Sequence, residues 1–306
     1  MLLCGIIVTL STFIGLHIST PTLANEEKPY VLSVKDWGID LGTLNPGDVV
    51  EGEYIIKNAG TEDFTYEAVA KPYAMLEDGA TTSYSVDNLY SQMKEWIVFR
   101  NPTGTVPADS EYTIYFTVKV PENAPAGSQY VGLHTTAFPI NDDDAKTSKI
   151  QSLVAVAPLL RANINGDTHI NGVVLENNLP SFFLEPKISA SAMVQNNGNV
   201  GFDVEYFLQV FPLFSDEELY TNEEKPLTNL VMPDSKRYIS QEWEDAPAIG
   251  IFKVKQTVIA YNDKSINEKI VIVCPLWLIC LVIFGIIAAV FWVIAKAKMR
   301  KTSKKE

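Results

Sequence analysis

The sequence predicts an all-β fold made of two tandem immunoglobulin-like β-sandwich domains, followed by one C-terminal transmembrane helix. Three observations predict it. From Tyr30 onward, apolar residues alternate with a period of two rather than 3.6. Turn signals rich in Pro, Gly and Asn separate these runs at short intervals. No charged residue occurs from Ile270 to Ala295, and a run of that length can cross a bilayer.

The first domain is predicted for residues 25–165. Its expected strands are Tyr30–Val34, Val49–Asn58, Phe64–Ala70, Trp96–Phe99, Tyr112–Val120, Gln129–Phe138 and Ile150–Ile164. About seven short strands with turns between them are typical of an immunoglobulin-type sandwich. The Cys–Trp–Cys core of antibody domains is absent, so the prediction concerns architecture and not kinship. An insertion at 74–95, rich in Ser, Tyr and Asp, interrupts the rhythm, and Asn88–Glu95 is predicted as a short helix.

The second domain is predicted for residues 166–269. Strands at Ile188–Gln195 and Val200–Phe211 flank an Asn-Asn-Gly turn, which is a strong hairpin signal because Asn and Gly tolerate positive φ. The first domain has the same order around Asn58-Ala59-Gly60, so the two domains are interpreted as a tandem repeat. Strands at Arg237–Trp243 and Phe252–Tyr261 follow, and the short segment 262–265 is predicted to link the domain to the membrane.

The two ends of the chain predict its location. Residues 1–24 carry no charge and end in small residues at Thr22-Leu23-Ala24, which predicts a secretory signal cleaved after Ala24, with a retained signal anchor as the alternative. The predicted membrane helix at 270–295 precedes a basic tail at 296–306. Because basic residues stay on the cytoplasmic side, we expect a single-pass cell-membrane protein with its N-terminal part extracytoplasmic and its tail cytoplasmic.

Composition excludes one class of partner and favours a compartment. The net charge is −13, although the tail holds six of the 24 basic residues, so the predicted exterior is strongly acidic and no nucleic-acid partner is expected. The three cysteines, Cys4, Cys274 and Cys280, fall in the predicted signal and membrane helix. A large exported region without disulfides points to a bacterial surface.

Several short motifs carry a family resemblance. In the first half they are Leu44-Asn45-Pro46-Gly47, Lys57-Asn58-Ala59-Gly60, Trp96-Ile97-Val98-Phe99 and Val120-Pro121-Glu122-Asn123, and in the second half Gln195-Asn196-Asn197-Gly198 and Met232-Pro233. These features resemble the WxL-interacting, peptidoglycan-binding surface proteins of Gram-positive bacteria. The resemblance implies a surface role at the cell wall and a second sandwich next to a single membrane span. It assigns no binding residue.

The sequence offers little support for catalysis. His134 is expected on a strand and His169 in the loop between the domains, and neither belongs to a catalytic or zinc-binding pattern. Asp142-Asp143-Asp144 could coordinate calcium, although three acids in a loop are usually only solvated. No catalytic residue, metal or cofactor is predicted.

Three aromatic residues are the candidate ligand-binding residues. Tyr84 and Tyr90 lie in the insertion and Trp96 directly follows it. Aromatic rings on loops stack on sugar faces and supply contact area at low entropic cost. For Trp96 the alternative is a place in the hydrophobic core, because it begins an apolar strand.

The predicted function is non-catalytic binding at a bacterial cell surface. The membrane-distal sandwich is expected to bind cell-wall glycan or another surface protein, and the C-terminal helix to lie in the lipid bilayer. One alternative is a structural stalk or assembly component of a membrane complex. A second alternative is a carboxylate-based ectodomain hydrolase, although no spacing of acidic residues singles out a catalytic pair.

Overall fold

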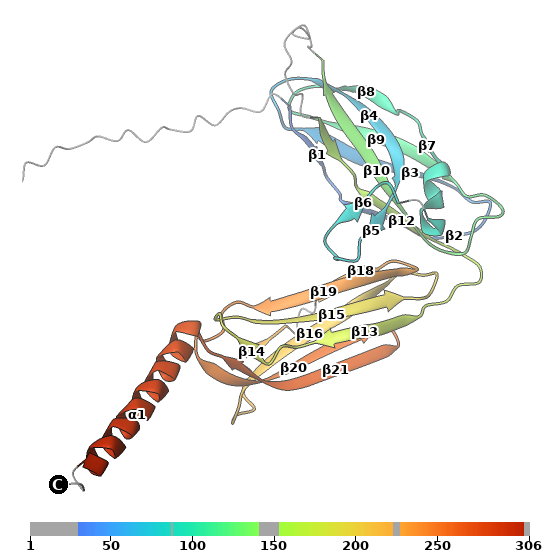
Figure 1. The fold of residues 1–306 in the computed structure, drawn as a ribbon. Helices are drawn as coiled ribbons and strands as arrows, with labels where there is room; N and C mark the ends of the chain where they lie inside the picture. The colour runs from blue at the N-terminus through green and yellow to red at the C-terminus, as the bar shows by residue number, and fades with distance from the viewer. Residues whose placement is uncertain (1–29, 87, 141–152, 223–226, 303–306) are drawn as a thin grey trace, which may run out of the picture.

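A computed structural model describes residues 30–86, 88–140, 153–222 and 227–302 (Figure 1). The predicted signal peptide at 1–24 and the acidic run Asp142–Asp144 lie outside the described residues. Two β-sandwiches follow one another along the chain, and one long helix ends it (Figure 1). The predicted all-β fold class is therefore confirmed.

The first sandwich packs a four-stranded sheet against a larger one. The four-stranded sheet has the order β1 (Leu32–Val34), β3 (Val49–Asn58), β9 (Ser110–Lys119), β7 (Ile97–Phe99). The facing sheet has the order β2 (Gly38–Leu44), β12 (Leu159–Ile164), β10 (Gly127–Pro139), β4 (Phe64–Pro72), β8 (Thr103–Val106), with β11 (Val154–Val156) also paired to β10. The core between them includes Ile56, Phe64, Phe116 and Leu160, all almost fully buried.

The second sandwich is built in the same way. A three-stranded sheet has the order β13 (Gly172–Asn178), β15 (Ile188–Asn196), β19 (Ser235–Trp243). The facing sheet has the order β14 (Phe182–Phe183), β21 (Asp263–Val273), β20 (Gly250–Ala260), β16 (Phe202–Pro212), β17 (Tyr220–Thr221), and β18 (Leu227–Val231) pairs with β16. Its core includes Ile188, Val204, Leu208 and Val254.

The same local structure closes a hairpin in each sandwich. The Asn58 side-chain amide donates to the carbonyls of Glu62 and Val106, and its Oδ1 accepts from the amide of Gly60. In the second domain, the Asn196 amide donates to the carbonyls of Val200 and Val231, and its Oδ1 accepts from Gly198. Both asparagines are completely buried. Their matched bonds support the interpretation of the chain as a repeat.

A second matched turn follows in each domain. Asp109 and Asp234 both adopt positive φ, at 48° and 51°. The next residue, Ser110 or Ser235, donates its hydroxyl to the carbonyl three residues earlier, at 2.6 and 2.7 Å. Asp tolerates this left-handed conformation better than most residues, since its short polar side chain can bond locally. The turn therefore has a sequence signature, an Asp-Ser pair after a buried valine.

The C-terminal boundary differs from the prediction. The segment 262–265 was predicted as a linker, but only Asn262 lies in the tight turn after β20, and residues 263–265 begin β21, which runs on to Val273. The helix α1 (Leu276–Thr302) begins only after Pro275 and not at Ile270. Its part Leu276–Lys296 is long and apolar enough to cross a membrane, and none of it is buried. The uncharged run therefore contributes both a β-strand and a helix.

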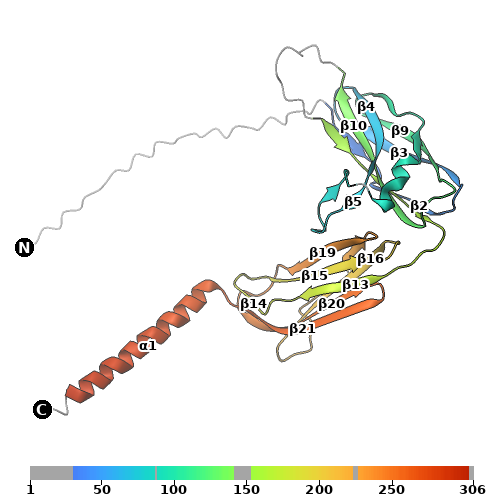
Figure 2. The ribbon, with the colours of Figure 1, turned by 45° about the vertical axis from the view of Figure 1, so that its right-hand side comes forward.

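The insertion forms a small unit beside the first sandwich. It contains a hairpin of β5 (Ala74–Met75) and β6 (Thr82–Ser83), then the 3₁₀ helix η1 (Leu89–Glu95). Asn88 caps η1 by accepting a bond from the amide of Tyr90. The helix was predicted at this place. In Figures 1 and 2 the hairpin extends from the first sandwich toward the second.

Candidate functional site

The insertion connects the two domains through backbone bonds. The amide of Tyr238, on the edge strand β19, donates to the carbonyl of Glu77 at 2.7 Å. The neighbouring Arg237 donates from Nη2 to the carbonyl of Gly79 at 3.0 Å. Gly79 has a φ of 71°, and a Cβ there would lie only 2.2 Å from the Tyr238 carbonyl oxygen. The close approach of the hairpin therefore requires glycine at this position.

An apolar cluster lies beside these bonds. Tyr73 and Tyr130 from the first domain and Met232 from the second are all buried in it. Met75, Tyr84, Leu159 and Leu230 pack against them. Tyr73 and Tyr84 meet edge to face, with ring centroids 5.7 Å apart. Burial of aromatic and methionine side chains at this junction stabilises the contact between the domains.

A second contact joins the domains near the connecting segment. The amide of Ser128 donates to the carbonyl of Asn199 at 2.9 Å, and the Asn199 side chain donates to the carbonyl of Ala126 at 3.2 Å. The amide of Gly201 donates to the Ser128 hydroxyl at 3.0 Å. Backbone and side-chain groups from both domains are thus bonded to each other at two separate places.

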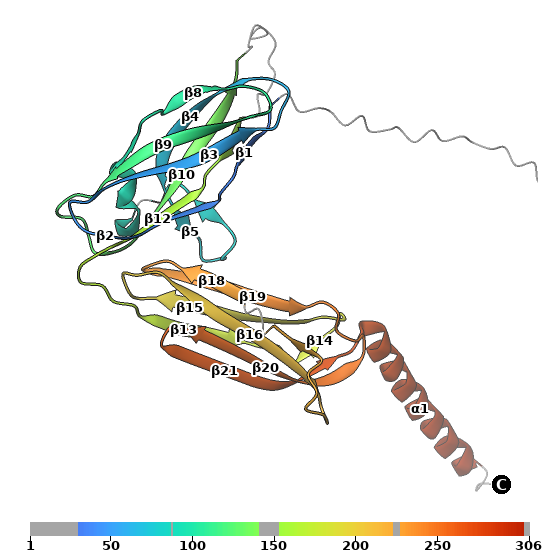
Figure 3. The same ribbon diagram turned by 180° about the vertical axis from the view of Figure 1, so that it is seen from behind.

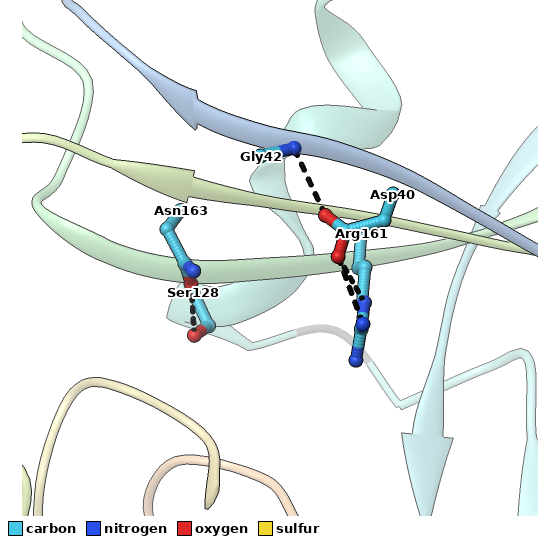
Figure 4. A network of polar contacts seen from close by, with 5 residues as sticks. All are labelled: Asp40, Gly42, Ser128, Arg161 and Asn163. Atoms are coloured by element: carbon cyan, nitrogen blue, oxygen red, sulfur yellow. Dashed lines mark hydrogen bonds and ion pairs between the residues drawn. The ribbon is translucent and has the colours of Figure 1, made fainter.

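A polar network in the first domain faces this second contact (Figure 4). Arg161 pairs with the Asp40 carboxylate at 2.8 Å, and that carboxylate also accepts from the amide of Gly42. Ser128 donates its hydroxyl to Asn163 at 2.6 Å. Together with Gly201 and Asp203 of the second domain, these side chains line a small cavity of about 150 Å³. Because Arg161 is already paired with a carboxylate, the cavity offers no free cation to an anionic ligand.

A larger cavity of about 310 Å³ lies between the insertion and the second domain. Its apolar lining comes from Met75, Val86, Tyr90, Met232 and Pro233. Polar side chains also line it, and they are Glu77, Asn88, Gln195, Asp234, Ser235 and Lys236. An apolar wall combined with a few polar groups, in a volume of this size, is typical of small-ligand sites.

The structure separates the three predicted ligand-binding residues. Tyr90 lines the larger cavity and is half-buried. Tyr84 is half-buried in the interdomain cluster, where its ring also meets His134 edge to face at 5.8 Å. Trp96 is only 7% exposed and belongs to the core of the first sandwich. Of the three, Tyr90 is therefore the residue whose side chain lines a cavity.

Burial alters the acid–base behaviour of the junction. Desolvation raises the pKa of Tyr73, Tyr90 and Tyr130, and for Tyr90 the negative charge of Asp234 raises the pKa further. These phenols therefore stay neutral at physiological pH. Desolvation also lowers the pKa of the Arg237 guanidinium.

His134 and His169 occupy different surroundings. His134 is on β10, within 3.5 Å of the Thr136 hydroxyl. Burial and the nearby charge of Lys71 lower the pKa of His134. His169 is exposed in the connecting segment, and its backbone amide donates to Asn199. Within the described ranges, no three His, Cys, Asp or Glu side chains come close enough together to hold a metal ion.

The second-domain side of the cavity was not anticipated from the sequence. Met232, Pro233 and Asp234 have the composition of an ordinary turn, and such a turn is usually solvated. One signal distinguishes them: the matching turn of the first domain has Pro107 and Ala108 where the second has methionine and proline. An apolar Met-Pro pair at the tip of a hairpin is a weak indication of a contact surface.

The comparisons with known proteins give a distant structural similarity only. No protein-family model matches the chain, and no curated protein matches it in sequence. Among solved structures, the class 5 fimbriae chaperone CfaA is 13% identical over 78% of this chain and 99% of its own, with a TM-score of 0.39. The complex of the Salmonella enterica SafA pilin with the SafB chaperone is 11% identical over 80% of this chain and 97% of its own, with a TM-score of 0.39. The E. coli chaperone DraB is 13% identical over 79% of this chain and 97% of its own, with a TM-score of 0.35. Similarity this low does not extend to function.

Proposed function

We propose that this chain is a non-catalytic, membrane-anchored surface protein that binds a cell-wall glycan in the cavity lined by Tyr90, between the insertion and the second sandwich. The observation that carries the proposal is the position of Tyr90, a half-buried ring that lines a cavity of about 310 Å³ together with residues of both domains. The proposed binding module is therefore the pair of domains and not the first sandwich alone.

The lining of the cavity matches the two kinds of surface on a sugar. A pyranose ring has an apolar face of C–H groups, which stacks on aromatic rings such as Tyr90. Its hydroxyl groups require polar partners around the rim, and the side chains of Asn88, Gln195 and Asp234 line the same cavity. A site that bonds hydroxyl groups in this way discriminates strongly against ligands that lack them.

Membrane anchoring follows from α1. Its apolar part Leu276–Lys296 is long enough to cross the hydrocarbon core of a bilayer. The basic residues that follow favour a cytoplasmic tail, and this supports the proposed location of both sandwiches outside the cell. Labelling of single cysteines in intact cells by a membrane-impermeant reagent tests this orientation, since only positions before α1 should react.

The test of glycan binding is sedimentation of the purified full-length protein, in detergent, with insoluble peptidoglycan. We expect retention that survives high salt, and a loss of most of it in Tyr90→Ala. Phe214→Ala is the matched control, since Phe214 is 95% exposed and does not line the cavity. Equal retention of the wild type, Tyr90→Ala and Phe214→Ala would contradict the proposal.

The same experiment separates the alternatives. If no wall fraction retains the wild type, a protein partner or a stalk role becomes the working account. The stalk has its own support in the bonds between the domains, such as Ser128 to Asn199 and Tyr238 to Glu77, which favour a fixed spacing. Release of soluble wall fragments, abolished by Asp234→Asn, would instead support the carboxylate hydrolase, since Glu77 and Asp234 line one cavity.

A further inference from the structure

We propose that the end of the second sandwich next to α1 lies in the lipid headgroup region, held there by an exposed apolar surface that we term the juxtamembrane patch. It consists of Phe182, Leu184, Ile249, Ile251, Ile270 and Ile272. The inference rests on α1 crossing the bilayer and is independent of the ligand proposed for the interdomain cavity.

At the centre of the patch, three side chains on neighbouring strands form one continuous row. Ile272 on β21 is paired with Ile251 on β20 and with Phe182 on β14. Their neighbours in sequence, such as Val271, Val273 and Phe252, point inward and are buried in the core. The alternation of a β-strand therefore places the three paired side chains together on the outer face. Exposure of 39–47% for each of them confirms that the protein leaves this face uncovered.

The patch ends directly at the membrane helix. The amide of Ile272 donates to the carbonyl of Ser181, and the amide of Cys274 to that of Phe183, both at 2.9 Å. The sheet is thus hydrogen-bonded up to Cys274, and α1 begins at Leu276. No flexible linker separates them. Where α1 enters the bilayer, the patch must consequently lie at the level of the headgroups.

Charged residues appear on the outer face at the distance from α1 that is expected for a sheet in the headgroup region. One row further from α1, Ile270 is paired with Lys253, and the next row pairs Glu268 with Lys255. The rows of Ile272 and Ile270 are about 7 Å apart along the strand. Interfacial elements are buried to a similar depth at the boundary between headgroups and acyl chains. Lys253 extends over the ring of Phe211 at 5.2 Å, so its long side chain can direct its charge away from the apolar surface.

A loop at the same end adds to the surface. Pro212, the last residue of β16, is paired with Phe252, so the loop that follows leaves the sheet beside Ile251. Phe214 in this loop is 95% exposed, the highest value among the large apolar residues described. In Figures 1 and 3 a loop projects from the second sandwich on the side toward which α1 extends. Trp277, in the first turn of α1 and 61% exposed, is the residue type favoured at membrane interfaces.

A lipid surface fits these observations better than a protein partner does. A bilayer is present wherever α1 spans it, whereas a partner would need a surface matched to the patch. Soluble proteins rarely leave a contiguous apolar surface uncovered, and one that is continuous with a membrane helix is accounted for by lipid. The consequence is a second sandwich held at a fixed tilt, which sets where the interdomain cavity stands above the membrane.

The experiment uses the full-length protein in lipid nanodiscs, with Cys4, Cys274 and Cys280 replaced by serine. A fluorophore is attached to Ile270→Cys or to Ile266→Cys, and lipids with a nitroxide in the headgroup act as quencher. The two positions are matched, since both are isoleucines on the outer face of β21, 57% and 52% exposed. Ile266 lies about 13 Å further along the strand from α1.

We expect several-fold stronger quenching at position 270 than at position 266. Equal quenching at the two positions would overturn the proposal. The fluorophore at position 270 could instead be shielded from water without being quenched by lipid, to an extent that rises with the protein-to-lipid ratio. That result would assign the patch to contact between copies of the protein and would also overturn the proposal. A label at Phe284→Cys in α1, quenched by nitroxides deep in the acyl chains, establishes separately that the helix is inserted.

Discussion

The two sandwiches close equivalent hairpins with the same hydrogen bonds. The turn that follows is exposed in the first domain and buried in the second. Asn58 and Asn196 are buried and make matched contacts in their own domains. In the first domain the turn after the buried valine is solvated, with Pro107 exposed. In the second domain Met232 and Pro233 of the corresponding turn are buried and line the interdomain cavity. The comparison teaches that the same turn can be exposed to solvent in one domain and buried against the neighbouring domain in the other.

The insertion provides the other half of this difference. Between the second strand of the Asn hairpin and the Asp-Ser turn, the first domain carries β5, β6 and η1. Among the residues that the structure describes, the second domain has β17 and β18 in the corresponding place, and β18 pairs with β16 as β8 pairs with β4 in the first domain. The extra segment of the first domain thus meets the turn of the second domain at the junction between them.

The largest effect is expected from removing the shared asparagines. Asn58→Ala and Asn196→Ala each remove a bond to a buried carbonyl, a bond to a partly buried carbonyl and a bond from a buried amide, so each should lower the free energy of unfolding by about 2–4 kcal/mol. Hydrogen exchange resolved by peptide measures the two domains separately. Asn178→Ala is the control, because Asn178 is exposed and bonds only to Glu176. If only one of the two variants lowers the free energy of unfolding of its domain, the two asparagines do not have equivalent roles.

Much of the fold was predictable because alternation and turn chemistry are local. Val49–Asn58 was predicted with the bounds that β3 has, since its apolar residues alternate up to a turn signal. The strand β2 (Gly38–Leu44) was missed because two glycines and an aspartate interrupt its pattern. The strand β21 was missed for the opposite reason: both of its faces are apolar near Val273, so it was indistinguishable from the start of the membrane helix.

The candidate site was predictable only in part. Tyr84 and Tyr90 were singled out because aromatic rings in an irregular insertion are conspicuous, and both lie at the junction in the structure. The partner surface was not predictable, since the hairpin contacts it through the carbonyls of Glu77 and Gly79. Backbone groups have no side-chain signature. Which edge strand they would reach depends on how the two domains are arranged in space.

A smaller effect is expected from a glycine that lets the domains approach. Gly127 and Gly42 both have positive φ, so Ala should cost about 1–2 kcal/mol at either position through backbone strain. At Gly127 the added Cβ would also lie 2.1 Å from the Asn199 carbonyl oxygen, whereas nothing lies within 4 Å of a Cβ at Gly42. Gly127→Ala should therefore also separate the domains. The distance between labels on the two sandwiches, measured by energy transfer, should change for Gly127→Ala and not for Gly42→Ala.

The smallest effect concerns a titratable residue that only the first domain has. His134 is paired with Val69, five residues after Phe64, and Thr257 is paired with Phe207, five residues after Phe202. Burial and Lys71 lower the pKa of His134 below its ordinary value near 6.5. Between the two pKa values the unfolded chain binds more protons, so the contribution of His134 to stability is complete above pH 6.5 and is lost as the pH falls through the folded pKa.

Acidification from pH 7.5 to 5 should therefore lower the unfolding temperature of the first domain, and His134→Gln should reduce that decrease. The Tyr84 ring rests against His134, so the interdomain cluster should loosen with it. The measurement is the difference in Tm between the two pH values for wild type and variant. If wild type and His134→Gln lose the same amount, the protonation of His134 is not what destabilises the first domain, and the proposed difference between the domains fails.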